Sequence, residues 1–254
     1  MLEIVTVAAL SDNYDFLVRD PASGRTALVD AADPAPILEE LSKRGWQLDE
    51  IWLTHHHWDH IDGANGIVEA TGAKITGAKA DAHRLPPLTR VVEPGMSFDF
   101  AGHKVDVMAA DGHTVGHVAF YIESAKALFT ADSLMALGCG RLFEGSAEQM
   151  WDTLSSFASL PDETVVYSGH EYTASNARFA LTIEPNNAAL KARADAIAAA
   201  RENGLPTVPS VLSEEKATNP FMRAALPEVK RLLGMVDAPD AEVFREIRAR
   251  KDAF

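Results

Sequence analysis

The sequence has almost no cysteine. Cys139 is the only one among 254 residues, so an intramolecular disulfide is impossible and a thiolate metal cluster cannot form. Any bound metal must therefore be held by nitrogen and oxygen ligands. The first residues also lack the basic and apolar regions of a signal peptide. Together these features predict a cytoplasmic protein.

Long apolar runs and an excess of positive charge are also missing. No run approaches the roughly 20 apolar residues of a membrane span. The chain carries 23 Lys and Arg against 37 Asp and Glu, a formal net charge of −14. This balance disfavours binding to nucleic acid or to anionic membranes, both of which attract basic proteins. An anionic small substrate then requires local cations or a metal that override the overall field.

Short apolar and β-branched runs predict a strand-rich part up to residue 172. Each run is bounded by Gly, Asp, Asn or Pro, as strand ends usually are. Helical spacing interrupts the strands at Pro34–Arg44 and Ala147–Leu160, where apolar residues recur three or four apart. The expected strands are Glu3–Ala9, Tyr14–Val18, Thr26–Val29, Glu50–Thr54, Lys74–Thr76, Lys104–Ala109, Val118–Ile122, Ala127–Thr130 and Thr164–Tyr167.

The sequence changes character after residue 172. An alanine-rich helix is expected over Asn186–Asn203, with Gly204 ending it. The turn-rich stretch Pro206–Pro220 leads to helices near Arg223–Leu233 and Ala241–Ala253. We therefore expect two domains, residues 1–172 and 173–254, the second mostly helical.

The strongest chemical signal is the segment Thr54-His55-His56-His57-Trp58-Asp59-His60, directly after the expected strand Glu50–Thr54. Alternate residues of an extended segment face one side, so His55 and His57 should project together, with Asp59 after them. A turn into a helix near Asp62 would bring His60 beside Asp59. Four possible ligands lie within six residues on this loop, and that density favours metal binding.

Three further signals also follow strands, where loops present functional groups on a rigid frame. Gly112-His113-Thr114 follows Lys104–Ala109, Asp132 follows Ala127–Thr130, and Ser168-Gly169-His170-Glu171 follows Thr164–Tyr167. The complete set offers enough ligands for two adjacent metals with one bridging carboxylate: His55, His57, Asp59, His60, His113, Asp132 and His170.

Imidazole and carboxylate ligands suit Zn, Fe or Mn, and we expect two divalent ions, with Zn favoured. Two metals about 3.5–4 Å apart would trap a bridging hydroxide, a nucleophile available at neutral pH. Not every histidine belongs to this set. His83 and His103 are taken as ordinary loop residues, His56 as a packing or supporting residue, and His117 as a structural residue that supports a ligand.

This constellation resembles the metallo-β-lactamase superfamily. The whole chain is similar, more narrowly, to glyoxalase II, the hydroxyacylglutathione hydrolases. The narrower resemblance is carried by Ser11-Asp12-Asn13-Tyr14, Gly138-Cys139-Gly140-Arg141, Gly169-His170-Glu171-Tyr172-Thr173, Glu215-Lys216-Ala217-Thr218-Asn219-Pro220-Phe221, and Arg248 with Lys251, Asp252 and Phe254 near the end.

The resemblance implies an α/β (α+β) fold, a metallo-β-lactamase-like αβ/βα sandwich of two mixed sheets between helices, followed by a C-terminal helical domain. It further implies hydrolysis of S-D-lactoylglutathione to glutathione and D-lactate, the second step of methylglyoxal detoxification. Residue by residue, it implies that one metal is held by His55, His57 and His113, the other by Asp59, His60 and His170, with Asp132 bridging.

We hypothesise that the bridging hydroxide attacks the thioester carbonyl, while Asp59 orients it or accepts its proton. The leaving thiolate has a reference pKa of about 8.5 and needs no dedicated acid. Arg248 and Lys251 share a helix face, and the resemblance implies that they hold the glycine carboxylate of glutathione. It also implies contacts from Tyr172 and Arg141. A solvated basic helix end is the alternative for the first pair.

The sequence departs from the family pattern at four positions near these motifs. Phe143 stands where many members have tyrosine, Ala131 replaces the usual glycine before the bridging aspartate, Asp111 replaces a proline, and Arg141 replaces a frequent lysine. All seven ligands are intact. The departures therefore concern substrate affinity and metal preference. Cys139 is expected to be a small packed residue, because no activating base is evident.

Two rival interpretations come from different classes. A persulfide dioxygenase shares the His/Asp motif, but it uses a single iron and lacks the glutathione-binding tail, so Arg248 and Lys251 favour the hydrolase. A metal-binding module without turnover would be expected to lose at least one ligand. A lactamase fits the helical tail poorly, and a nuclease would need a basic surface.

We expect a monomer, because no sustained heptad seam appears.

Overall fold

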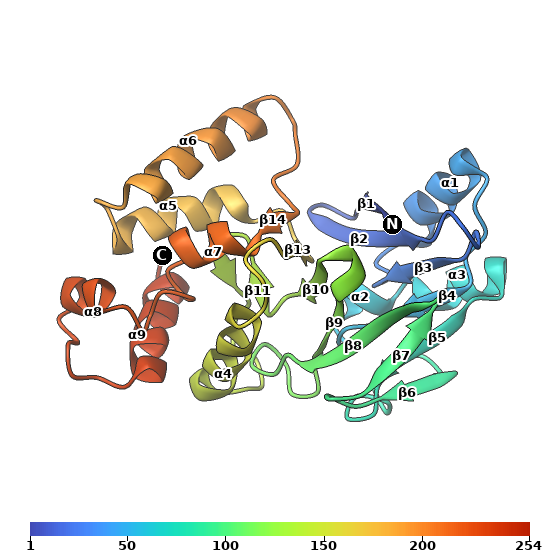
Figure 1. Cartoon of the computed structure of the whole chain (residues 1–254), viewed down its shortest axis with the longest axis horizontal. Coiled ribbons are helices and arrows are strands. Elements are labelled where there is room, and N and C mark those ends of the chain that lie inside the picture. The colour runs from blue at the N-terminus through green and yellow to red at the C-terminus, as the bar shows by residue number, and fades with distance from the viewer. The chain divides into compact units, whose positions relative to one another are not determined.

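The computed structural model describes residues 1–254, which form two compact units (Figure 1). Unit 1 comprises Met1–Ala109 and Val115–Thr130, and unit 2 comprises Ala110–Thr114 and Ala131–Phe254. Each unit is therefore built from two separate stretches of the chain. The segment 110–114, which carries His113, belongs to unit 2 although its flanking strands belong to unit 1.

Unit 1 contains a sheet with strand order β1-β2-β3-β4-β5-β6. Strand β2 pairs antiparallel with both β1 and β3, whereas β3 to β6 run parallel to one another. The strands are β1 (Glu3–Ala9), β2 (Asn13–Arg19), β3 (Thr26–Val29), β4 (Glu50–Trp52), β5 (Lys74–Ala78) and β6 (Arg90–Val92). Helices lie on the connections from β3 to β4 and from β4 to β5, and a helix-free loop joins β5 to β6.

A second set of strands in unit 1 lies in the order β10-β9-β8-β7, each pair antiparallel. These are β7 (Ser97–Phe100), β8 (His103–Ala109), β9 (Val118–Ile122) and β10 (Ala127–Ala131), with a 3₁₀ turn at Glu123–Ala125 between the last two. Trp52 of the first sheet packs edge-on against Phe98 and Phe100, with ring centroids 5.3 and 5.1 Å away. The two sheets thus share an aromatic core within this unit.

The outer face of the first sheet is covered by helices α1 (Pro34–Arg44) and α3 (Ala64–Thr71), and the short α2 (Trp58–Ile61) lies between them in the chain. Helix α1 shows why the sequence predicts it well. The Asp33 side chain accepts a hydrogen bond from Ala35 N, Pro34 opens the first turn, and Gly45 ends the helix with φ +66°. Ile37 and Leu41 point into the core.

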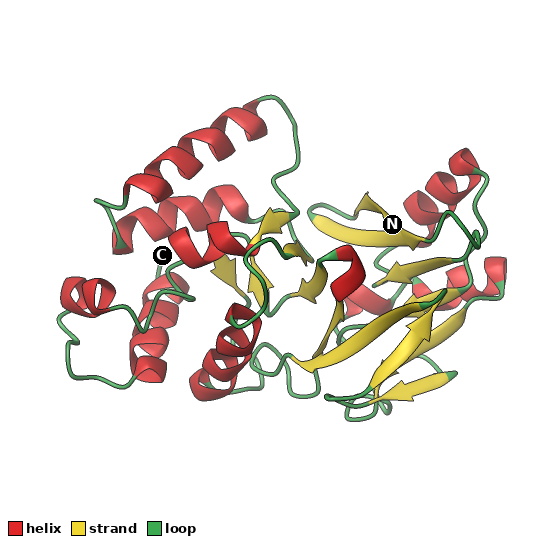
Figure 2. Ribbon diagram, in the orientation of Figure 1, coloured by secondary structure: helices red, strands yellow, loops and turns green.

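Unit 2 is mostly helical (Figure 2). Its helices are α4 (Ala147–Ala158), α5 (Thr173–Ile183), α6 (Ala188–Glu202), α7 (Leu212–Thr218), α8 (Pro227–Leu233) and α9 (Asp240–Asp252). Two antiparallel strand pairs complete it, β11 (Leu134–Met135) with β12 (Gly138–Cys139), and β13 (Val165–Ser168) with β14 (Ser210–Val211). The stacked rings of Phe179 and Phe221, 6.0 Å apart, mark its interior.

Several expected elements differ from those observed. The stretch Pro206–Pro220, expected to be turns, contains helix α7, whose residues Ser213-Glu214-Glu215-Lys216-Ala217 are mostly adequate helix formers. Helix α5 and strands β6 and β7 were not expected at all. The strand at Glu50 ends at Trp52 rather than at Thr54, which leaves the histidine segment in irregular backbone.

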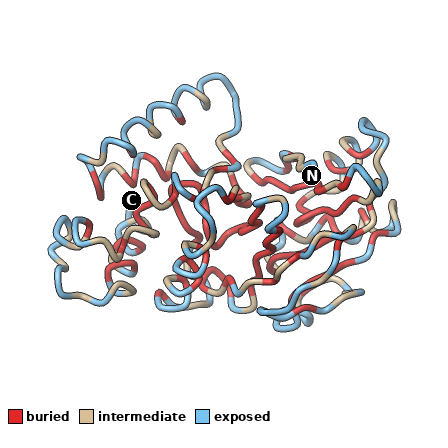
Figure 3. Tube along the Cα trace, in the orientation of Figure 1, coloured by how far each residue is buried: buried red, intermediate tan, exposed pale blue.

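Burial follows the strands, while the outward faces of α6 and α8 are exposed (Figure 3). None of the helices combines the length and apolar character that a membrane crossing requires.

Candidate metal centre

In unit 1 the candidate ligands lie on the loop and helix that follow β4. His57 is the N-terminal flanking residue of α2, with φ −63° and ψ 142°, and Asp59 and His60 lie in the first turn of that helix. The ring centroids of His55 and His57 are 4.7 Å apart, and those of His55 and His60 are 4.4 Å apart. The prediction that these side chains gather on one loop is confirmed for this part of the set.

Hydrogen bonds fix the tautomers of two of these histidines. Asp30 accepts from Nδ1 of His60 at 2.9 Å, and from the hydroxyl of Thr54 at 2.9 Å. Because the Thr54 hydroxyl donates to Asp30, it accepts from Nδ1 of His55, 3.0 Å away. In both rings Nδ1 therefore carries the proton, and the lone pair of Nε2 is left to bind a metal, a common arrangement for metal-ligating histidines.

Asp30 was not predicted. It is buried, and it follows strand β3 directly, so its position after a strand was a signal available in the sequence. It lies near enough to His55 and His60 for ligand atoms of the three to fall within 4.8 Å of one another. Its oxygens already accept three hydrogen bonds, from His60 and from the backbone and hydroxyl of Thr54, so it acts as a support for the ligands.

Asp59 is also supported by a neighbour whose role was not predicted. The side-chain amide of Asn13 donates to the backbone carbonyl of Asp59 at 3.0 Å and to its Oδ2 at 3.1 Å. The same Oδ2 is 3.8 Å from Nε2 of His60. Asn13 is buried, and it belongs to the Ser11–Tyr14 motif that carried part of the family resemblance.

The two histidines that were set apart from the ligands behave as expected. His56 pairs through Nδ1 with the buried Asp81 at 3.1 Å. The ring of His117 stacks on that of His55 with centroids 4.5 Å apart and an interplanar angle of 11°. His56 thus pairs with a buried carboxylate, and His117 packs against the candidate ligand His55.

In unit 2, Asp132 lies between two histidines. Its Oδ2 is 3.3 Å from Nε2 of His113, and its Oδ1 is 3.4 Å from Nε2 of His170. All three side chains are buried. The Nδ1 atom of His113 donates to the carbonyl of Arg141 at 2.8 Å, so Nε2 again carries the lone pair. The backbone of Gly169 donates to Ala131, which fixes the strand end before His170.

These spacings fit a divalent ion better than direct hydrogen bonds. Bonds of about 2.0–2.1 Å from N and O ligands to a tetrahedral metal place neighbouring ligand atoms about 3.3 Å apart. An imidazole that donated directly to a carboxylate would lie closer, at about 2.7–2.9 Å. The residues of both units therefore have the chemistry and, within unit 2, the spacing of a site for divalent metal.

Close backbone packing explains the glycine before Arg141. A Cβ placed on Gly140 would lie 2.1 Å from the carbonyl oxygen of Asp132 and 2.8 Å from Nδ1 of His113. Residue 140 must therefore be glycine for His113 and Asp132 to keep their spacing. The departure at Ala131 also has a structural meaning, because its φ is +41°, a region that favours glycine.

Burial perturbs two side chains near these ligands. The pKa of Asp15 is raised to about 8, chiefly by burial and secondarily by the charge of Asp30. The pKa of the Cys139 thiol is raised to about 11, again chiefly by burial. A thiol with so high a pKa is not a nucleophile at neutral pH, which agrees with its prediction as a packed residue.

The predicted substrate residues all lie in unit 2. Arg248 is buried, donates from Nη1 to the carbonyl of Cys139 at 3.0 Å, and pairs through Nη2 with Asp252 at 2.8 Å. Lys251 contacts the carbonyl of Ser175 at 3.4 Å. Its pKa is lowered to about 8, first by burial and then by nearby Arg248, Arg178 and Arg141. Positive charge thus gathers around Lys251 in unit 2, against the acidic balance of the whole chain.

Aromatic rings flank the two unit 2 histidines. The Tyr172 ring stacks on that of His170, with centroids 4.6 Å apart and an interplanar angle of 3°. The Phe143 ring lies 5.3 Å from that of His113. Phe143 is 63% exposed and Tyr172 40% exposed, so both present apolar surface to solvent beside a ligand.

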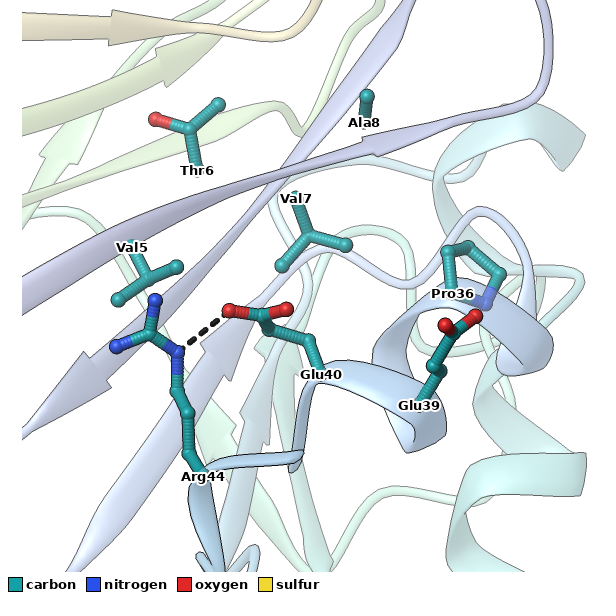
Figure 4. A pocket seen from close by; sticks show the side chains of 8 residues that line it. All are labelled: Val5, Thr6, Val7, Ala8, Pro36, Glu39, Glu40 and Arg44. Atoms are coloured by element: carbon teal, nitrogen blue, oxygen red, sulfur yellow. Dashed lines mark hydrogen bonds and ion pairs between the residues drawn. The ribbon is translucent and has the colours of Figure 1, made fainter. Parts of the chain in front are cut away.

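A hollow of about 340 Å³ lies elsewhere in unit 1, between β1 and α1 (Figure 4). Its wall includes Val7, Glu40 and Arg44, and Glu40 and Arg44 are paired with each other at 2.5 Å. None of the candidate ligands or substrate residues lines it.

Comparisons with known proteins agree with this geometry. The model of the metallo-beta-lactamase superfamily matches residues 12–170, and that of the hydroxyacylglutathione hydrolase C-terminus matches residues 171–254. The chain is 62% identical over 253 residues to a protein named hydroxyacylglutathione hydrolase from Roseobacter denitrificans, covering 100% of this chain and 99% of that protein. The chain belongs to the hydroxyacylglutathione hydrolase family.

Membership in the hydroxyacylglutathione hydrolase family confirms the predicted fold class and the expectation of a hydrolytic enzyme. The BLEG-1 B3 metallo-beta-lactamase has the same fold, with TM-score 0.67, 16% identity and coverage of 87% of this chain and 99% of that one. TTHA1623, solved in a di-iron-bound form, is 28% identical with TM-score 0.57, covering 66% of this chain and 91% of that one. The division at residue 172 and the seven-ligand set stay predictions.

Proposed function

We propose that this protein hydrolyses 2-hydroxyacyl thioesters of glutathione, with S-D-lactoylglutathione as substrate and glutathione and D-lactate as products. The observation that carries the proposal is the full-length similarity to proteins named hydroxyacylglutathione hydrolase, at 62% and 61% identity. The similarity includes the C-terminal helices with Arg248 and Lys251. This reaction would be the second step in the detoxification of methylglyoxal.

The metal assignment belongs to the same proposal. One ion would be held by His55, His57 and His113, and the other by Asp59, His60 and His170. Asp132 would bridge the two, and its geometry supports that role, because it turns one oxygen toward His113 and the other toward His170. Zinc is favoured, and iron or manganese fits the same ligands.

When bound, the metals would supply Lewis acidity, which polarises a thioester carbonyl and lowers the pKa of water so that hydroxide is available at neutral pH. Asp59, whose carboxylate accepts from the amide of Asn13, would accept the proton of the attacking water. The water oxygen bonds to the carbonyl carbon, and the C–S bond breaks with its electron pair leaving on sulfur. The thiolate needs no acid, because its reference pKa is about 8.5.

Glutathione would be bound by unit 2. Lys251 would attract the glycine carboxylate, and Arg248, whose guanidinium is held by Cys139 and Asp252, would add charge beside it. Tyr172 and Arg141 are both exposed. Tyr172 follows His170 by two residues, and the carbonyl of Arg141 accepts a hydrogen bond from Nδ1 of His113. The loss of a hydroxyl at Phe143 predicts weaker binding of glutathione than in relatives with tyrosine there. We also propose that the protein is cytoplasmic and monomeric.

The test is hydrolysis of S-D-lactoylglutathione by purified protein, followed by loss of thioester absorbance, with metal content measured on the same sample. We expect turnover and close to two metals per chain. The variant Asp132→Ala should lose nearly all activity and the second metal. Absence of turnover with a single bound iron would contradict the proposal and favour persulfide dioxygenase activity.

A further inference from the structure

One motif of the helical region has no place in the proposed chemistry, namely Glu215–Phe221. Its residues Glu215 and Asn219 lie on and just after α7, and both are fully buried. They contact the short ribbon formed by β11 and β12, residues 134–139, which connects Asp132 to Gly140 and Arg141. All these residues belong to unit 2.

The side-chain amide of Asn219 holds both strands of this ribbon. Nδ2 donates to the carbonyl of Met135 on β11 at 3.1 Å and to that of Gly138 on β12 at 3.0 Å. Its Oδ1 accepts from the backbone of Phe221 at 3.0 Å, which fixes the orientation of the amide. One amide thereby sets the position of both strands relative to α7.

Glu215 holds the turn of the same ribbon. Its Oε2 accepts from the backbone N–H of Leu137 at 2.8 Å and from Nδ2 of Asn219 at 3.0 Å. Its other oxygen is paired with Arg193 of α6. The carboxylate is thus compensated, as a fully buried charge must be.

The two ends of the ribbon carry functional groups. Immediately after it, Gly140 N donates to the carbonyl of Asp132 at 2.8 Å, and the carbonyl of Arg141 accepts from Nδ1 of His113 at 2.8 Å. At its last residue, the carbonyl of Cys139 accepts from Arg248 at 3.0 Å. A displacement of the ribbon would therefore move a candidate bridging ligand, the support of a histidine ligand, and a substrate arginine together.

We propose that Glu215 and Asn219 are positioning residues, which hold the β11–β12 ribbon so that Asp132, His113 and Arg248 keep their mutual spacing. The inference rests on the proposed function. Apolar side chains could fill the same space without the cost of burying polar groups. Unlike hydrogen bonds, however, apolar contacts are not directional and would not fix the orientation of the ribbon. Hydrogen-bonded supports of metal ligands are worth about 10–100-fold in metal affinity or activity.

The test compares Asn219→Ala with the matched control Asn187→Ala. Asn187 also donates from its amide to a backbone carbonyl, that of Ala217 at 3.0 Å, and it caps α6, but it does not touch the ribbon. Metal-free protein is titrated with Zn²⁺ against a chromophoric chelator, and KM and kcat are measured after loading. Both variants should have a lower Tm than the wild type, because each loses a hydrogen bond to a backbone carbonyl.

We expect Asn219→Ala to weaken Zn²⁺ binding about tenfold or more and to raise KM, while Asn187→Ala stays within about twofold of the wild type. Zn²⁺ affinity and KM equal to the wild type in Asn219→Ala, with only Tm lowered, would overturn the inference and leave the proposed function intact. Wild-type protein that binds none of Zn²⁺, Fe²⁺ and Mn²⁺ would overturn both. If Asn219→Ala does not fold, Glu215→Gln, which keeps the size of the side chain, is measured by the same criteria.

Discussion

At the scale of single residues, the candidate metal centre is defined by which nitrogen of each histidine carries a proton. His55, His60 and His113 each present Nδ1 to an oxygen, supplied respectively by Thr54, Asp30 and Arg141. Sequence spacing identifies histidines as ligands, but it contains no information about these oxygens. Two of the three lie far from their histidine in the chain, so only the fold shows them.

Asn13 gives a prediction at this scale. Asn13→Ala removes both hydrogen bonds to Asp59 and leaves every candidate ligand in the sequence unchanged, so the carboxylate loses its orientation. We expect Zn²⁺ affinity of the metal-free protein to fall by about 10–100-fold, with a parallel loss of kcat. Asn203→Ala is a suitable control, because its amide bonds only to Ala199 on an exposed helix end. Equal Zn²⁺ affinity in Asn13→Ala and the wild type would contradict the prediction.

Lys251 gives a second prediction. With its pKa lowered to about 8, mainly by burial, this side chain is mostly charged at pH 7 and mostly neutral at pH 9. If it binds a carboxylate of glutathione, KM should rise over that interval, because the attraction is lost as the proton leaves. Lys251→Arg keeps its charge throughout and should remove most of this rise. Identical pH profiles of KM in the two proteins would exclude Lys251 from substrate binding.

At the scale of elements, the sequence predicts what is local and misses what depends on partners. Helix α1 and strands β1, β3 and β9 have the expected bounds, because caps, turns and apolar spacing are all present in the segment itself. Helix α7 was missed, since Pro206, Pro209 and Pro220 flank it and suggest turns, and burial against the ribbon stabilises it. The ribbon β11–β12 is too short for any pattern to reveal.

Helix α1 offers a prediction about stability. Asp33→Ala removes the side-chain acceptor for Ala35 N at the start of the helix. Loss of such a cap should lower the free energy of unfolding by about 1 kcal/mol. Because α1 carries no candidate ligand, kcat and KM should be unchanged. Denaturant unfolding and the thioester assay on the same preparation measure both, and a fall in kcat would show that this end of the sheet is coupled to the site.

At the scale of the whole molecule, the membership of the candidate ligands in two units could not be predicted. The four candidate ligands between residues 55 and 60 belong to unit 1, whereas His113, Asp132 and His170 belong to unit 2. The sequence places His113 between two strands of unit 1, so its membership of unit 2 follows only from three-dimensional packing. The fold class, by contrast, was accessible from motifs, and the same motifs supply the candidate ligands, which stay a prediction.

If the chain binds the proposed metals, their removal should lower its stability. A ligand that binds only the folded state stabilises it by about 2.7 kcal/mol at 100 times its Kd. We expect a chelator to abolish hydrolysis and lower Tm by several degrees, and added Zn²⁺ to restore both. Asp132→Ala should respond far less to the chelator. A Tm of the wild type that is indifferent to chelator would contradict a resident metal.

The interleaved course of the chain also bears on synthesis at the ribosome. The segment 110–114 emerges early, yet the unit to which it belongs is finished only when α9 has been made, since Arg248 bonds to Cys139. A nascent chain thus exposes the imidazoles of several candidate ligands before the helices of unit 2 have been made. Correct metal acquisition should accordingly follow translation of the last helix, and a stalled chain would bind ions with the affinity of a flexible peptide.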